Sequence, residues 1–101
     1  MKFGLSDEHW KLVLDLAVNP LKSKGAQVWV FGSRARGDHV RFSDLDILFA
    51  AEDGESFTLG EIGSIKEALE ESDLPVRVDL VDDRVLAKDY REGVERDRIE
   101  I

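Results

Sequence analysis

The stretch QVWVFGSRARGDHVRFSDLD, residues 27–46, sets the architecture expected for this 101-residue chain. It opens with five residues, 27–31, whose β-branched and aromatic side chains favour a strand. Gly32-Ser33 ends that strand abruptly, because glycine permits a tight turn and serine commonly begins a helical turn. After ten intervening residues, Asp44-Leu45-Asp46 leads into a second apolar run that extends to residue 51. The stretch therefore predicts two strands joined by a turn that carries polar side chains.

Hydrophobic periodicity on either side of this stretch predicts helices and further strands. Helical spacing behind the N-cap candidate Ser6 predicts a helix over about 7–18, which Asn19-Pro20 should break or kink. A capping box predicts a second helix over about 58–71, and residues 76–81 alternate as a third strand. The charged tail predicts a weak helix near 85–90 and a short edge strand at 98–101. We expect one α/β (α+β) domain over 1–101, with helices packed on a small mixed sheet.

The composition restricts the classes of function. With 14 Lys and Arg against 22 Asp and Glu, the net charge of -8 disfavours extended binding to nucleic acid. The lack of cysteine excludes disulfides, thiolate zinc sites and cysteine nucleophiles. No run resembles a signal peptide or a membrane span, so we expect a soluble, cytoplasmic protein without a membrane partner. Residues 32–41 nevertheless hold three arginines against one aspartate, which favours a compact anion such as a triphosphate.

Three aspartates are the candidate catalytic and metal-binding residues. Asp44 and Asp46 point the same way on a strand, and Asp79 lies at a matching depth of a later strand. Left unpaired they would repel one another, and the pKa of at least one would rise. Magnesium prefers oxygen ligands, and two such ions stabilise both oxygens of a phosphoryl transfer. The alternative is that Asp44 caps a turn while the other two face solvent.

Gly32 and Ser33 are the candidate phosphate cradle, because glycine lets the backbone approach a ligand and serine adds a hydroxyl and backbone donors. Gly37 is not followed by Lys-Ser or Lys-Thr, so the pattern is not a P-loop. Arg34 and Arg36 are candidates for neutralising phosphates, and Arg34 is favoured because it adjoins Ser33. For each arginine alone, an exposed structural role is an equal alternative.

A few other conspicuous residues are expected to be structural. Trp10 and Trp29 should fill the core, and Tyr90 should pack. Ser43 is expected to shape the turn that positions Asp44.

The segment Gly32-Ser33-Arg34-Ala35-Arg36-Gly37-Asp38, with ten residues between Ser33 and Asp44 of Ser43-Asp44-Leu45-Asp46, resembles the minimal nucleotidyltransferase family of the DNA polymerase β superfamily. The similarity is densest over 26–50 and returns at 76–81. It implies a polymerase β-like nucleotidyltransferase fold in which Asp44 and Asp46 hold two magnesium ions and Asp79 completes the triad. Gly32 and Ser33 would then grip the triphosphate. Base selectivity would rest on a pocket formed partly by the last helix.

The resemblance also implies a reaction and a partner. An acceptor hydroxyl would attack the α-phosphate of ATP, with Asp79 as proton acceptor and Arg34 helping to hold the phosphates. Stand-alone members look like antitoxins that adenylylate a tyrosine of a HEPN-domain ribonuclease toxin, which implies a hetero-oligomer. Two alternatives remain: a non-catalytic antitoxin module that neutralises the toxin by occlusion, and a small-molecule nucleotidyltransferase.

Overall fold

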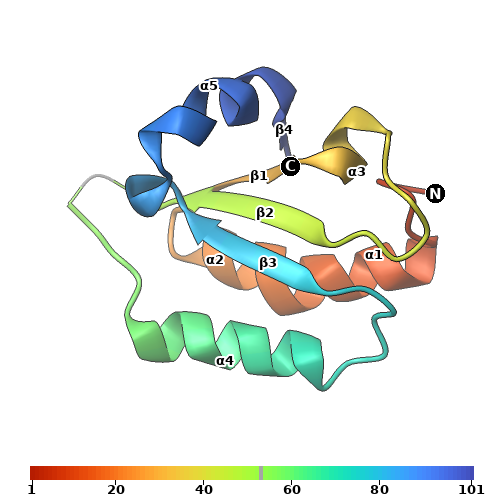
Figure 1. Ribbon diagram of the computed structural model, residues 1–101. Coiled ribbons are helices and arrows are strands. Elements are labelled where there is room, and N and C mark those ends of the chain that lie inside the picture. The colour runs from red at the N-terminus through yellow and green to blue at the C-terminus, as the bar shows by residue number, and fades with distance from the viewer. Residues whose placement is uncertain (53) are drawn as a thin grey trace.

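A four-stranded mixed sheet in the order β3-β2-β1-β4 forms the centre of the computed structural model, which describes residues 1–52 and 54–101 (Figure 1). β1 (Gln27–Phe31) pairs antiparallel with β2 (Leu45–Ala50) and with the short β4 (Ile99–Glu100). β2 pairs in parallel with β3 (Val78–Asp82). The small mixed sheet confirms the expected fold class.

Helices cover both faces of this sheet. One face carries a long helix made of three segments and, beside it, α4; the segments are α1 (Asp7–Val13), η1 (Leu14–Val18) and α2 (Asn19–Ser23), and α4 is Leu59–Glu70. The other face carries α3 (Ser33–Arg36), the 3-10 turn η2 (Asp83–Val85) and α5 (Lys88–Asp97), as Figure 1 shows. None of the described helices is long and apolar enough to cross a membrane.

The alternation of β2 divides the sheet into a large apolar face and a smaller one. Leu45, Ile47 and Phe49 are buried in the main core with the long helix and α4. Leu48 packs on the opposite face with Trp29 and Val94 of α5. Because successive strand residues point to opposite faces, Asp46 lies on the α3 and α5 side. The main core is therefore on one face, and Asp46, the polar residue of β2, is on the other face with the smaller apolar cluster.

The first helix continues through Asn19-Pro20, so the expected break at these residues is wrong. Residues 14–18 form a π-helical segment in which the Asn19 amide donates to the carbonyl of Leu14, five residues back. Proline has no N–H, and its ring would clash with the carbonyl four residues earlier in a regular α-helix. The wider π turn relieves this conflict just before Pro20. The helix can therefore continue to Leu21, which is fully buried.

The later elements follow the predicted order with shifted bounds. The capping box is present, because Thr58 Oγ1 accepts from the Glu61 amide at 3.0 Å while the Thr58 amide donates to Glu61 Oε1 at 3.2 Å. β3 begins two residues later than predicted, after Pro75 and the buried Val76. The last helix covers 88–97 instead of 85–90.

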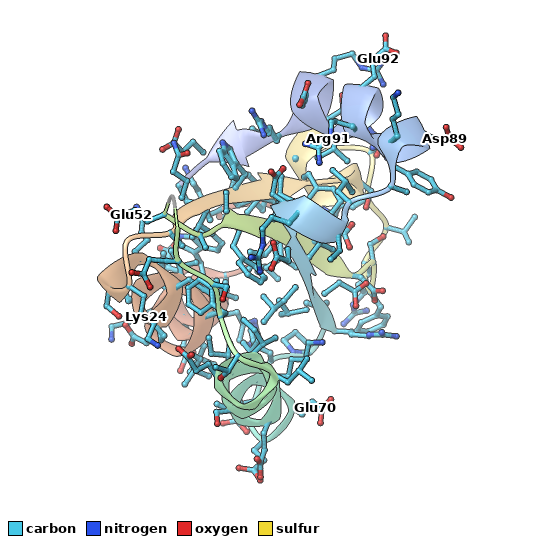
Figure 2. The ribbon with its side chains drawn as sticks, turned by 90° about the vertical axis from the view of Figure 1, so that its left-hand side faces the viewer. Lys24, Glu52, Glu70, Asp89, Arg91 and Glu92 are labelled. Atoms are coloured by element: carbon cyan, nitrogen blue, oxygen red, sulfur yellow. The ribbon has the colours of Figure 1, made fainter. Side chains whose placement is uncertain are left out.

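Charged side chains cover the outside of α4 and α5. A further charged residue, Arg91, joins α5 to the η2 turn. Asp89 and Glu92 point outward in Figure 2. Arg91 lies under α5, where Nη1 donates to Asp83 Oδ1 at 3.1 Å and Nη2 donates to the Asp83 carbonyl at 2.8 Å. Arg91 therefore holds α5 against η2 at the end of β3.

The expected packing of the aromatic residues is confirmed for both tryptophans and is wrong for the tyrosine. Trp29 is buried in the smaller apolar cluster, and Trp10 is partly buried against the main core. Tyr90 is 69% exposed and belongs to neither apolar cluster.

We expect Phe49→Ala to lower the free energy of unfolding by about 3–5 kcal/mol, because the truncation leaves a cavity in a closely packed core. Phe49 is 2% exposed and meets Phe57 edge to face, with ring centroids 5.4 Å apart. Urea denaturation measures the change. Leu59→Ala is the control, because Leu59 is 95% exposed and should change stability by less than about 0.5 kcal/mol. Equal stability of the two variants would contradict this assignment of the core.

Candidate functional site

The turn from β1 into α3 depends on Gly32. Its φ of 76° and ψ of -157° lie in a region that side chains rarely allow. A Cβ placed on Gly32 would also overlap the carboxylate oxygen Oδ2 of Asp46. Glycine therefore permits both the turn and the close approach of a carboxylate to the backbone. α3 begins at the next residue, Ser33, so the first amides of this short helix have no partner inside it.

The three predicted aspartates lie next to one another in the sheet. Asp46 of β2 is in register with Phe31 of β1 on one side and with Asp79 of β3 on the other. Asp44 is exposed two residues earlier, at the entrance to β2. The structure thus brings Asp44, Asp46 and Asp79 together, and the main-chain turn at Gly32 adjoins them.

The electrostatics of Asp46 reflect this crowding. The pKa of Asp46 is raised to about 6, first by burial and then by the negative charges of Asp79 and Asp44, while the positive charge of Arg36 opposes the shift. Two neighbouring carboxylates that disfavour ionisation of a third are the surroundings in which a divalent cation is stabilising. All the donors are oxygens, so the chemistry of the set suits magnesium.

The carboxylates do not form a finished metal cage. Within 1–52 and 54–101, no three acidic or histidine side chains converge closely enough to hold one ion. Asp79 Oδ1 instead lies 3.1 Å from Arg77 Nη2, an ion pair along β3 that the sequence analysis did not predict. The sequence does contain a signal for this pair, because residues 77 and 79 point to the same side of a strand. The predicted triad is therefore present as an electrostatically coupled row.

Arg34 has a different environment from the one expected. Its side chain is 3% exposed, and burial lowers its pKa. Nε donates to the Ser43 carbonyl at 3.0 Å, Nη1 to Phe3 at 2.9 Å and Nη2 to Arg41 at 3.1 Å. A guanidinium bound to three backbone carbonyls is not placed to contact a phosphate. The structure therefore does not place Arg34 for the predicted phosphate contact. Its hydrogen bond to the Ser43 carbonyl instead positions the peptide unit that leads into Asp44.

The loop that Arg34 holds has its own hydrogen bonds. Ser43 Oγ accepts from the Val40 amide at 2.9 Å, and the Ser43 amide donates to the Val40 carbonyl at 3.1 Å. These bonds give Ser43 the turn-forming position that the sequence predicts. The approach to Asp44 is consequently ordered from both sides of the loop.

Arg36 is the arginine that remains on the surface beside the carboxylates. Nε donates to Asp38 Oδ2 at 3.1 Å and Nη1 to Asp97 Oδ2 at 3.3 Å, and these bonds raise the pKa of Arg36. Its charge acts on Asp46. Of the two arginines predicted to contact phosphate, Arg36 has the suitable location.

A cavity of about 260 Å³ lies between the Gly32 turn and the last helix. Its lining includes Phe31, Gly32, Arg36, Tyr90, Val94 and Asp97. α5 therefore supplies one wall next to the candidate phosphate cradle. The individual residues of this wall were not predicted, because the charged tail has only a weak helical pattern.

Comparisons with known proteins agree with this geometry. Residues 14–101 match the family model of a nucleotidyltransferase domain. The "Probable protein adenylyltransferase MntA" of Haemophilus influenzae is 42% identical over 69 residues, which are 68% of this chain and 59% of that protein. The chain therefore spans less than two thirds of the length of that relative.

Two solved structures are similar over most of the chain. One, assigned as a minimal nucleotidyltransferase, has a TM-score of 0.69 and 39% identity and covers 100% of this chain and 97% of its own. A toxin–antitoxin structure with AMP-PNP has a TM-score of 0.66 and 24% identity, covering 85% of this chain and 69% of that one. At that identity the second structure shares the fold alone.

In the metal-free protein, we expect Asp46 to make stability depend on pH. A raised pKa in the folded state means that stability is fully present below about pH 4 and is lost as pH rises through about 6. Two pKa units correspond to about 3 kcal/mol, which solvent screening reduces to about 1–2 kcal/mol at this half-buried position. Asp46→Asn should therefore gain that amount at pH 7 and none below pH 4, in urea denaturation with EDTA. The control is Asp73→Asn, because Asp73 is exposed. If the unfolding free energy of Asp46→Asn fell with pH as steeply as that of the wild type, Asp46 would not be the source of the pH dependence.

Replacing Arg34 should destabilise the loop that leads into Asp44. We expect Arg34→Ala to lower the free energy of unfolding by about 3 kcal/mol, because it leaves buried carbonyls without donors. Arg34→Lys restores part of this donation, so it should cost less and remain folded for NMR. In that variant the amide resonances of residues 3 and 41–44 should shift more than elsewhere. The exposed Arg96→Lys is the matched control, and unchanged resonances in that loop would argue against the positioning role.

Proposed function

The chain belongs to the minimal nucleotidyltransferases of the nucleotidyltransferase-domain family, and on this premise we propose that it transfers AMP from ATP to a hydroxyl group of a partner protein. The observation that carries the proposal is the coupled row of Asp44, Asp46 and Asp79 beside the Gly32 turn. A phosphate cradle next to crowded carboxylates is the arrangement that metal-assisted phosphoryl transfer requires.

Each residue has a distinct part in the proposed reaction. Gly32 and Ser33 hold the triphosphate through the turn and the first amides of α3, while Arg36 adds positive charge beside it. Asp44, Asp46 and Asp79 would hold the two magnesium ions, which when bound would neutralise charge on the phosphates. In this proposal the residues accelerate the transfer by positioning the reactants and by stabilising the charge that develops on the phosphate.

The proposed reaction exchanges one bond at the α-phosphorus for another and transfers one proton. The acceptor oxygen forms a bond to the α-phosphorus as the bond from that phosphorus to pyrophosphate breaks. Asp79 takes the hydroxyl proton, because it belongs to the outermost strand of the carboxylate row and is 35% exposed at its side chain.

The proposed acceptor is a tyrosine of a HEPN-domain ribonuclease toxin, for which this chain would be the antitoxin. Support comes from the relative named as an adenylyltransferase and from the toxin–antitoxin neighbour with the same fold. This chain carries 14 Lys and Arg against 22 Asp and Glu. Its net charge of -8 also suits association with a basic protein.

The alternative of neutralisation by occlusion also has an observation in its favour. In the free chain the carboxylate of Asp79 is already paired with Arg77, as it would be in a protein that kept its acids for stability. A small-molecule acceptor is the third candidate, and it would reveal itself by turnover without any protein partner.

Intact mass spectrometry of the HEPN-domain partner, incubated with this protein, magnesium and ATP, tests the proposal. We expect one or more added AMP groups, and a rate at least about 1,000-fold lower with Asp44→Asn, Asp46→Asn, because charge stabilisation is lost. Asp73→Asn makes the same change outside the site and should retain the wild-type rate. A tight complex without added mass for any of the four nucleotides, with the double variant still protecting cells, would establish occlusion instead.

A further inference from the structure

The outer edge of β3 is open in the described part of the chain. β3 is the last strand in the order β3-β2-β1-β4, and no strand within 1–52 and 54–101 pairs with its other side. All five of its residues are half-buried. Figure 1 faces this edge, with β3 in front of β2 and α4 running beneath it. An exposed strand edge presents backbone N–H and C=O groups that can pair with another chain.

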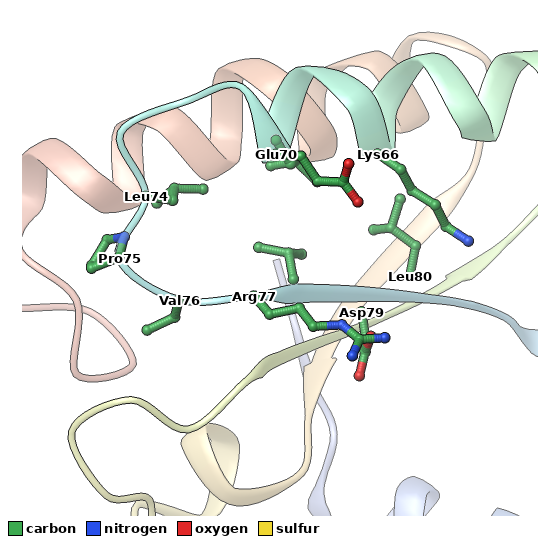
Figure 3. Close-up of a pocket in the computed structure, with 10 residues that line it drawn as sticks. Lys66, Glu70, Leu74, Pro75, Val76, Arg77, Asp79 and Leu80 are labelled. Atoms are coloured by element: carbon green, nitrogen blue, oxygen red, sulfur yellow. The ribbon is translucent and has the colours of Figure 1, made fainter.

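A groove of about 590 Å³ runs between this edge and α4. Figure 3 shows Lys66 and Glu70 reaching from α4 toward the strand, and Arg77 lying along the strand beside Asp79. Leu74 and Val76 contribute apolar surface from the connection between the two elements. The groove therefore combines an apolar floor with a charged rim.

Asp79 belongs to both the groove and the candidate active site. It lines the groove, and in the sheet it is in register with Asp46. A strand added to β3 would place one side chain opposite Asp79, with Cβ atoms about 4.5–5.5 Å apart and on the face that carries Asp46. The residues before and after that side chain would point to the other face, where α4 and the groove lie.

We propose that the β3 edge and this groove bind an extended, acidic segment of the partner protein, with its acceptor residue opposite Asp79. The inference rests on the proposed function, which requires an acceptor hydroxyl at Asp79. Pairing to an open strand edge is a general mode of peptide recognition, in which backbone bonds supply affinity and pockets for alternate side chains supply specificity.

The charges of the rim favour an acidic occupant. Four charged side chains line the groove: the exposed cations Lys66 and Arg77, and the carboxylates of Glu70 and Asp79. When Asp79 bonds to the acceptor hydroxyl, two cations remain against the single carboxylate of Glu70. The side chain of Arg77 is 76% exposed, so its 3.1 Å ion pair with Asp79 is screened by solvent and is weak. A carboxylate on the bound segment would attract Arg77 and leave Asp79 free for the acceptor hydroxyl.

A second copy of this chain fits the edge less well. β3 has the sequence VDLVD, with Asp79 and Asp82 and no cation of its own. Two such strands side by side would bring like charges together, which is destabilising in cross-strand pairs.

Hydrogen–deuterium exchange of this protein with the purified HEPN-domain ribonuclease tests the location. We expect the amides of residues 78–82 to become protected on binding, while β4 at the opposite edge remains unchanged. If protection instead appears with rising concentration of this protein alone, together with a doubled mass in light scattering, self-association replaces the proposal.

Charge reversal on the groove tests its specificity. We expect Lys66→Glu to raise KM for the ribonuclease about 10-fold with unchanged kcat and unchanged ATP binding, because only partner docking is affected. Lys22→Glu makes the same charge change on α2, away from the groove, and should retain the wild-type KM. AMP transfer with unprotected β3 amides and equal KM for both variants would overturn the inference. Protection of β3 without any transfer would leave the docking site in place and remove the proposed function.

Discussion

The close approach of the Asp46 carboxylate to the backbone of Gly32 is the constraint on which the rest of the site depends. A side chain at Gly32 would occupy the position of Asp46 Oδ2, and the positive φ of Gly32 is needed for the strand to turn into α3. The register of β1 with β2 pairs Phe31 with Asp46, so the turn and the carboxylate are aligned by the sheet itself. A single glycine thus joins the candidate cradle to the candidate ligands, and a rigid sheet sets the distance between them.

The electrostatics of the site are unfavourable in the free protein. Asp46 is half-buried beside two other carboxylates, which raises its pKa, and the nearby arginines are hydrogen-bonded or paired to other acids. Arg36 bonds to Asp38 and Asp97, and Arg77 pairs with Asp79. Functional sites commonly retain such destabilising arrangements because a ligand relieves them. Here a cation and a polyanion together would relieve the repulsion among the carboxylates and complement the charge of Arg36.

Arg34 shows how a buried charge organises a surface site without belonging to it. It ties the N-terminal segment at Phe3 to the loop before β2, and its three acceptors are all neutral carbonyls. Burying a cation without a carboxylate is costly unless its hydrogen bonds are satisfied. The cost is consistent with a role in holding the loop at Asp44, where displacement of the carboxylate by an ångström would matter for transfer chemistry.

Local sequence was sufficient to predict the strands, the capped helix and the positions of Gly32, Asp44, Asp46 and Asp79, because strand alternation and chain spacing are short-range properties. It was insufficient where the outcome depended on distant partners. Arg34 and Arg36 have the same charge and are two residues apart, yet only the fold places Phe3 within hydrogen-bonding reach of the first and Asp97 within reach of the second. The continuity of the first helix past Pro20 likewise accompanies burial of Leu21 in the core. The open edge of β3 follows from strand order, and strand order arises from long-range pairing that no local pattern encodes.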